Sequence, residues 1–215
     1  ADISYGSSIE VEYANGLIFH SGAKHEKFLT DDENQNAIFN QPRYLIANYK
    51  LSNANELAKY FKYAAENNSP LVIMAQDYTA GFVNACLGMK IEYGVPVMLI
   101  QPYKYAERRQ YWLRDMAVSL GATLFDDVTS KIPRGGVEDL GSSDKIVVKM
   151  NSTNIIGGHP KPDVLESYQK ELKSKADQET SSFNREKILE RLANLTGELA
   201  LIKVGAESET LAKER

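Results

Sequence analysis

The feature that most constrains this chain is a series of short, nearly continuous apolar runs separated by stretches with helical periodicity. The apolar runs occupy residues 44–47, 71–75, 95–100, 122–125 and 146–148. Strands that are apolar at consecutive positions are typically buried on both faces of a sheet. The helical stretches lie between the runs, at residues 53–67, 79–92 and 107–120. This alternation predicts an α/β domain built from right-handed crossovers.

The remaining segments have more polar patterns. Ser52 or Asn53 can cap the first helix, and the Asn-Asn-Ser-Pro stretch at 67–70 ends it. Residues 21–40 are polar and charged, which predicts a surface loop or a hairpin insertion. After Pro160 the pattern predicts a long charged helix and then a second helix at 185–195. Residues 199–204 return to strand character.

Composition excludes several classes of protein. The 215 residues suffice for one large domain or for one domain with a short appendage. A net charge of −4, without a basic stripe, argues against a nucleic-acid partner. No run reaches about 18 apolar residues, so we expect neither a membrane span nor a membrane partner. The single Cys86 cannot form an internal disulfide, and we expect a cytoplasmic protein.

Motifs for chemistry are sparse. The chain contains no phosphate-binding loop, no dinucleotide fingerprint and no nucleophile elbow. Its three histidines, His20, His25 and His159, fall in polar segments whose spacing does not favour zinc. Asp126 and Asp127 follow a predicted strand, where α/β enzymes often place catalytic acids. An enzyme or small-ligand domain that uses this pair is therefore one hypothesis for the function.

Two neighbouring helices carry more apolar surface than a helix resting on a sheet needs. Each has two stripes at helical spacing. On the first helix the stripes are Leu57, Tyr60 and Ala64, then Ala58, Phe61 and Ala65. On the second they are Phe82, Cys86 and Met89, then Val83, Leu87 and Ile91. A second stripe indicates either full burial, which is the simpler interpretation, or an apolar groove for a protein partner.

Specific segments resemble a known family. Residues 185–205 are similar to the pattern R-E-K-L-x-E-R-x-A-x-L-x-G-G-x-A-V-I-x-V-G, and shorter similarities occur at 42–53, 102–109, 138–141 and 153–157. These segments resemble the apical domain of group I chaperonins, the GroEL family. The resemblance covers essentially the whole chain, loosely before Pro42 and tightly after Pro133, and indicates a divergent member.

The resemblance implies an α/β apical-domain fold, with a β-sheet core flanked by helices and two groove helices on the surface. It implies an intermediate-domain tail at 1–10, the apical domain at 11–197 and the start of a trailing intermediate-domain segment at 198–215. In the family, this groove captures non-native polypeptides, and a co-chaperonin's mobile loop competes for it. Carried over by position, the groove residues are Leu17, Ile18, Ala58, Phe61, Lys62, Ala65, Val83, Leu87 and Gly88.

The resemblance also implies that this part of the subunit is not an enzyme. ATP and Mg would bind a separate domain of the intact, ring-forming parent, so we expect no cofactor and no metal here, and a monomeric fragment. A virus-encoded member would work in the host cytoplasm, and an organellar one in the matrix. If the groove is correct, Phe61→Glu or Leu87→Glu should abolish capture without unfolding the domain. A purely structural role, with an unused groove, is a third hypothesis.

The sequence departs from the family pattern at several groove positions. Lys62 replaces an acid, Gly88 replaces a branched aliphatic residue, and Ala58 replaces a leucine. A short insertion also follows Gly22. We therefore expect a groove that is less apolar and differently charged than the family pattern.

Overall fold

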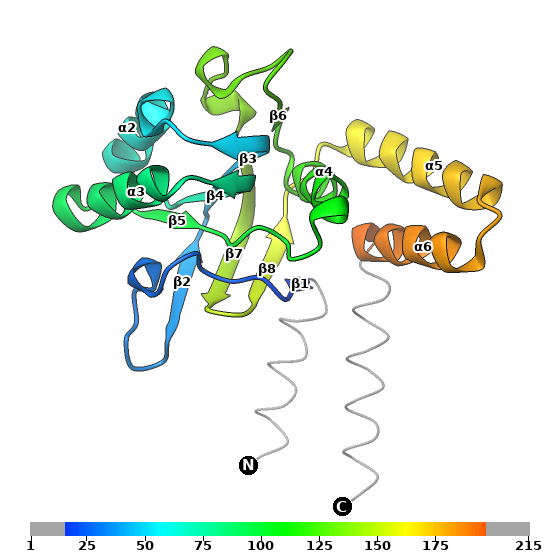
Figure 1. Cartoon of the computed structure of the whole chain (residues 1–215), viewed down its shortest axis with the longest axis horizontal. Helices are drawn as coiled ribbons and strands as arrows, with labels where there is room; N and C mark the ends of the chain where they lie inside the picture. The colour runs from blue at the N-terminus through cyan, green and yellow to red at the C-terminus, as the bar shows by residue number, and fades with distance from the viewer. Residues whose placement is uncertain (1–15, 197–215) are drawn as a thin grey trace, which may run out of the picture. The chain divides into compact units, whose positions relative to one another are not determined.

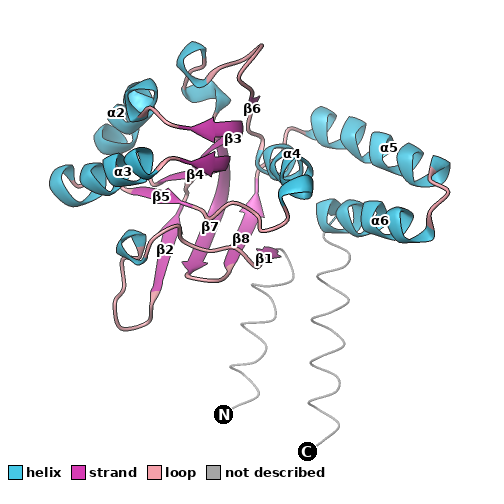
Figure 2. Ribbon diagram, viewed as in Figure 1, coloured by secondary structure: helices cyan, strands magenta, loops and turns pink. Residues whose placement is uncertain are grey.

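The computed structural model describes residues 16–196, which form a mixed α/β structure (Figures 1 and 2). The strands are β1 (Gly16–Phe19), β2 (Asn36–Asn40), β3 (Arg43–Leu51), β4 (Leu71–Tyr78), β5 (Val97–Leu99), β6 (Leu124–Phe125), β7 (Gly141–Lys149) and β8 (Thr153–Gly158). The α-helices are α2 (Ala58–Asn67), α3 (Ala80–Tyr93), α4 (Arg109–Leu120), α5 (Pro162–Gln178) and α6 (Ser182–Thr196). The 3-10 helices are η1 (Glu26–Phe28), η2 (Ala54–Leu57), η3 (Ala106–Arg108), η4 (Ile132–Arg134) and η5 (Val137–Asp139). The predicted α/β class is confirmed.

The chain divides into two compact units. One comprises residues 18–160, and the described part of the other comprises residues 16–17 and 161–196. The tails expected at 1–10 and 198–215, and the strand expected at 199–204, lie outside the described residues. The domain boundaries expected from the resemblance therefore stay predictions.

The core of the larger unit is a parallel set of strands in the order β6-β3-β4-β5. Strands β3 and β4 pair from Arg43↔Leu71 to Ala47↔Ala75 and, after a register shift, as far as Leu51↔Tyr78. The residues at the centre of both strands have no exposed surface: Leu45, Ile46, Ala47, Val72, Ile73 and Met74. Burial on both faces explains why these strands are apolar at consecutive positions. Strands β5 and β6 are shorter than the apolar runs that predicted them.

An antiparallel group continues the sheet beyond β3, with β7 pairing β3, β2 and β8 (Figure 2). The expectation of a surface loop or hairpin at 21–40 is wrong in part. The chain does turn back at the Asp31–Asn36 bridge, but β2 pairs β7 from Asn36↔Lys149 to Asn40↔Lys145. Phe28 and Leu29 are also buried. Strand β2 has only five residues, and only Ala37 among them is fully buried. Its sequence therefore lacks the run of apolar residues from which a strand could be predicted.

Strand order places the helices. The path β3-β4-β5 advances in one direction, so right-handed crossovers put α2 and α3 on the same face of the sheet. Figure 1 shows these two helices together on one side. Helix α4 leads back from β5 to β6, on the far side of β3, and packs against β3, β4 and β7. It therefore covers the opposite face.

Local capping fixes the ends of the two helices that matter most here. The Asn53 side chain accepts a hydrogen bond from Asn55 N ahead of η2 and α2, and Asn68, with φ of 45°, ends α2 in the left-handed conformation. Thr79 caps α3 through Phe82 N, and Gly94, with φ of 65°, ends it. Glycine and asparagine tolerate the left-handed region, so both stop signals follow from residue type.

The described helices of the smaller unit form an antiparallel pair, α5 and α6 (Figure 2). The buried residues of α5 are Tyr168, Leu172 and Ala176, spaced four apart. Arg191 of α6 donates to the Tyr168 hydroxyl at 2.6 Å, and Arg185 donates to the Ala176 carbonyl at 3.1 Å. The predicted charged helices are confirmed, with the second beginning three residues earlier than expected.

Candidate functional site

The predicted groove residues on α2 and α3 differ sharply in exposure. On α2, Phe61 is only 4% exposed, whereas the other three positions project into solvent: Ala58, Lys62 and Ala65. On α3, Val83 and Leu87 are each 9% exposed, and Gly88 is half-buried. We call the three buried side chains, Phe61, Val83 and Leu87, the buried floor of the two helices.

The two predicted positions from the N-terminal segment lie in β1. Leu17 is half-buried and Ile18 is 52% exposed. Successive residues of a strand point to opposite faces, which is why the two side chains differ in exposure.

The apolar residues of α3 are buried near the start of the helix and exposed near its end. Val83 and Leu87 are buried, but Ile91, the next residue of the same stripe, is 63% exposed, and Tyr93 is 72% exposed. Both helices run from the carboxyl end of one parallel strand to the amino end of the next, so they run in the same direction. Ile91 therefore lies at the same end of the helix pair as the exposed Ala65. We give the name α2–α3 surface to the half-buried Gly88 and the exposed Ala58, Lys62, Ala65, Ile91 and Tyr93.

The helical spacing places Ile91 in an apolar stripe, whereas the groove residues expected from the resemblance do not include it. The signal that could have found it is its spacing, because Ile91 follows Leu87 by one helical turn. Tyr93 has no such signal, since it occupies the last position before the glycine cap.

The charge on this surface is weak. Lys62 Nζ lies 3.8 Å from the Glu66 carboxylate one turn later, and both side chains are largely exposed. Exposed pairs of this kind contribute about 0–1 kcal/mol and are screened by salt. The lysine that departs from the family pattern therefore changes the surface less than a lone charge would.

The side of α3 that faces the sheet is apolar and buried. The rings of Tyr78 and Phe82 stack with centroids 5.8 Å apart, and the Tyr78 hydroxyl donates to the carbonyls of Ile73 and Ile100. Cys86 has no exposed surface, and burial raises the pKa of its thiol to about 12. A thiol with this pKa is neutral at physiological pH, so Cys86 packs as a small apolar residue.

The acid pair Asp126–Asp127 does not form a shared site. The Asp126 carboxylate accepts hydrogen bonds from Val128 N at 2.8 Å, Thr129 N at 2.6 Å and Thr129 Oγ1 at 2.6 Å. These bonds lower its pKa to about 2, with the Thr129 hydroxyl the largest cause. A carboxylate with so low a pKa is a poor general base near neutral pH. Asp127 is exposed to solvent.

The ligand crevice of an α/β sheet lies at the carboxyl ends of the strands where the strand order reverses. Here that point is between β3 and β6, and the loop after β6 fills it. Ile132 has no exposed surface; its N–H donates to the Tyr49 hydroxyl at 3.3 Å, and its carbonyl accepts from the Tyr60 hydroxyl at 3.0 Å. Lys59 Nζ donates to the carbonyls of Pro133 and Gly135, at 2.9 and 2.6 Å.

Gly135 completes this seal. A side chain there would lie 2.6 Å from ring atoms of Phe125 and 2.7 Å from the Tyr60 hydroxyl. Burial also raises the pKa of Tyr60 to about 12, so its hydroxyl stays a neutral donor. The crevice is therefore occupied by the protein's own chain.

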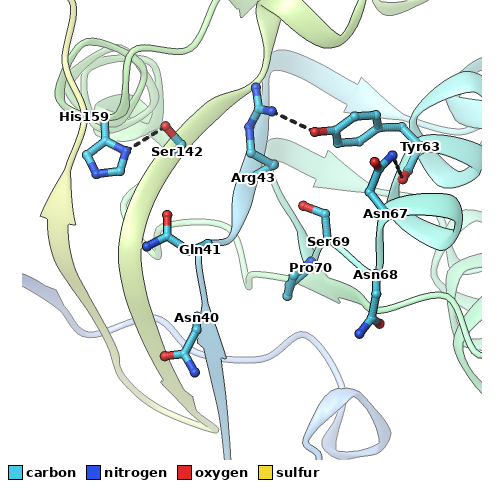
Figure 3. A pocket seen from close by; sticks show the side chains of 10 residues that line it. All are labelled: Asn40, Gln41, Arg43, Tyr63, Asn67, Asn68, Ser69, Pro70, Ser142 and His159. Carbon is cyan, nitrogen blue, oxygen red and sulfur yellow. Dashed lines mark hydrogen bonds between the residues drawn. The ribbon is translucent and has the colours of Figure 1, made fainter.

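A polar pocket of about 390 Å³ lies at the amino end of β3 (Figure 3). Arg43 projects between its walls, but its guanidinium donates to the Tyr63 hydroxyl and to the carbonyls of Gly141, Leu140 and Val137, at 3.0–3.2 Å. The cation is therefore held by the protein. The remaining walls are mostly amides and hydroxyls: Asn40, Gln41, Asn67, Asn68, Ser69 and Ser142.

Two residues of the pocket wall, Ser142 and His159, form a row with Asp144, which does not line the pocket. Ser142 Oγ lies 2.9 Å from His159 Nδ1, and His159 Nε2 lies 2.7 Å from Asp144 Oδ1. In hydrolase triads the serine meets Nε2 and the aspartate meets Nδ1, so the ring here is reversed. The nearby backbone amides of Gln41 and Arg43 donate to Asp144 O and Pro70 O, at 2.8 Å each. We interpret the row as a cross-strand contact between β7 and the end of β8.

The other two histidines have separate environments. His25 caps η1 by accepting from Lys27 N at 3.0 Å, and His20 is exposed. Across residues 16–196 no group of three or more metal-ligating side chains comes together. Within the same residues, no helix has both the length and the apolar character needed to cross a bilayer.

A comparison of the chain with models of known protein families finds no match.

Proposed function

We propose that this chain is the apical, polypeptide-binding part of a divergent group I chaperonin subunit, and that it binds non-native polypeptides on the α2–α3 surface. The observation that carries the proposal is the exposure of Ile91 at the end of an otherwise buried helical stripe, with the exposed Tyr93 two residues later in the same turn. Exposed large apolar side chains near one helix end mark a contact for apolar segments of another protein.

The form of this surface suits weak, unselective binding. Non-native chains have exposed apolar side chains in common, rather than a sequence. Ala58, Ala65 and Gly88 leave shallow places between the exposed residues, where client side chains of different shapes can lie. A single contact of this size binds weakly, and a ring of subunits would multiply it by avidity. We propose that a co-chaperonin's mobile loop competes for the same surface.

Two further features support the proposal. The segments that resemble the family at 138–141 and 185–195 fall in regular structure, at η5 and the start of β7 and within α6. The alternative, a small-ligand or enzyme domain that uses Asp126 and Asp127, would need the crevice that Ile132 occupies. In the proposed parent subunit, ATP and Mg bind elsewhere, and this part contributes no catalytic residue. We place it in the cytoplasm.

The test is capture of a permanently non-native protein by the 215-residue chain. Fluorescently labelled, reduced and carboxymethylated lactalbumin would be titrated, with anisotropy as the readout. Ile91→Glu should weaken binding at least about tenfold, because a charge at a desolvated apolar contact costs more than about 1.4 kcal/mol. The matched control is Val164→Glu, an exposed aliphatic residue on α5 that should leave binding unchanged.

The structure changes which substitutions can test the surface. From the sequence, Phe61→Glu and Leu87→Glu are expected to leave the domain folded. In the structure both residues belong to the buried floor, so each substitution would bury a charge. Ile91→Glu avoids this problem because its side chain is in solvent. If Ile91→Glu binds the labelled lactalbumin as tightly as the parent does, the α2–α3 surface is not the binding site.

A further inference from the structure

The segment after Gly22 is hydrogen-bonded to two strands of the sheet, β7 and β5, before it reaches α3. Ala23 N donates to Lys149 O at 2.9 Å at the end of β7, and a side chain at Gly22 would collide with the same carbonyl. Lys24 N then donates to Leu99 O at 2.8 Å in β5, and Ala23 forms a bridge with Ile100. The chain therefore arrives beside α3 from a fixed position.

The 3-10 helix η1 packs against α3 and β5. Phe28 is completely buried and Leu29 is 5% exposed, so this short segment has its own apolar contact with the rest of the unit. The His25 cap fixes its first turn. A single 3-10 turn has little stability alone, so its position depends on these contacts.

Lys90 of α3 joins the helix to this segment. Its ammonium donates to the carbonyl of Lys27 and to that of Leu29, the latter at 3.1 Å. Burial lowers the pKa of Lys90, and the nearby Asp32 opposes that shift. A partly buried ammonium needs such acceptors, so the two carbonyls and the ammonium hold one another in place.

Lys90 lies in the same turn of α3 as the two exposed apolar residues, Ile91 and Tyr93. Lys90 immediately precedes Ile91 and lies three residues before Tyr93, in the last turn of α3. Helix ends fray most easily, and an apolar contact on a frayed turn would lose its orientation whenever the turn opened. The contact between Lys90 and the segment 25–29 ties down the one turn of α3 that carries the exposed residues.

We propose that Lys90 is a positioning residue of the α2–α3 surface: by anchoring the last turn of α3 to residues 25–29, it presents Ile91 and Tyr93 in a fixed arrangement to the incoming polypeptide. The inference rests on the proposed function and names residues outside the groove set expected from sequence. Preorganisation of this kind strengthens binding by reducing the ordering that must occur on association.

The test compares Lys90→Met, which keeps the apolar stem and removes the ammonium, with Lys90→Arg, which keeps the charge and the donors. In Lys90→Met, amide exchange across residues 88–94 should become about tenfold faster, the effect of losing about one net hydrogen bond. Affinity for the labelled, carboxymethylated lactalbumin should fall by up to about threefold, because the apparent affinity scales with the fraction of molecules in which the turn is closed. Lys90→Arg should restore both values.

The control is Lys170→Met, which removes an exposed lysine paired with Glu166 at 3.1 Å on α5 and should change neither readout. A merely structural role would speed exchange in Lys90→Met without weakening capture, and that result overturns the positioning role. Unchanged exchange across 88–94 overturns the anchor itself. Failure of the parent to bind lactalbumin at all would instead refute the proposed function, and the exchange comparison would still decide the anchor.

Discussion

The carboxyl edge of the parallel strands and the α2–α3 surface are both rich in apolar residues, yet only one of them is open. At the edge, Ile132 is fully buried and its backbone groups bond to Tyr49 and Tyr60. On α3, Val83 and Leu87 of the apolar stripe are buried, whereas Ile91, the next residue of the same stripe, is exposed. The usual ligand crevice of an α/β fold is closed here, and the apolar surface left for a partner is on the helices.

The largest expected effect tests the boundary between the buried floor and the exposed surface on the helices. Phe61→Glu should lower the free energy of unfolding by about 3–5 kcal/mol, because it buries an unpaired charge. Ile91→Glu should change it by less than about 0.5 kcal/mol, as surface substitutions do. Urea denaturation followed by circular dichroism gives both values. Equal losses in the two variants would mean that Ile91 is as buried as Phe61.

A smaller loss is expected at the closed edge. Ile132→Ala should cost about 2–3 kcal/mol, the lower part of the range for such truncations, because a loop can partly collapse around the cavity. Val128→Ala, at a highly exposed position of the same loop, is the control and should stay within about 0.5 kcal/mol of the parent. If the two variants unfold at the same urea concentration, Ile132 does not seal the edge.

The sequence predicted the parallel strands and the helix ends well, because the signals for both are local. Continuous apolar runs mark strands buried on two faces, and Asn53, Asn68 and Gly94 act on their own helices. The periodicity also identified the surplus apolar stripes of α2 and α3. It could not say which residues of a stripe are covered, since Leu87 and Ile91 are equivalent in pattern and differ only in their tertiary neighbours.

The contacts that were missed join residues far apart in the chain. The ammonium of Lys90 meets the carbonyl of Lys27 across 63 positions, and the hydroxyl of Tyr60 meets the carbonyl of Ile132 across 72. Backbone carbonyls are present at every residue, so no residue type marks such an acceptor. The same limit explains why Asp126 remains in the alternative, enzymatic hypothesis from sequence: the Val128 and Thr129 amides that bind its carboxylate have no signature in the sequence.

The smallest effect concerns Asp126, whose loop closes the edge. Its pKa in the folded protein is about 2, below the usual 3.8. A lowered folded-state pKa means that the hydrogen bonds to the carboxylate stabilise the fold fully above the unfolded-state value and are lost as the pH falls through about 2. Asp126→Asn should therefore be less stable than the parent near neutral pH, and the difference should shrink between about pH 4 and about pH 2.

Urea midpoints of the parent and of Asp126→Asn, measured across this pH range, test the expectation. Asp127→Asn is the matched control, because the exposed neighbour takes no part in the hydrogen bonds to Val128 and Thr129. A constant difference between parent and Asp126→Asn at every pH would mean that ionisation of this carboxylate is not linked to folding. The loop would then be held by the buried Ile132 and by its hydrogen bonds to Tyr49, Tyr60 and Lys59, and the closed edge would owe nothing to the ionised acid.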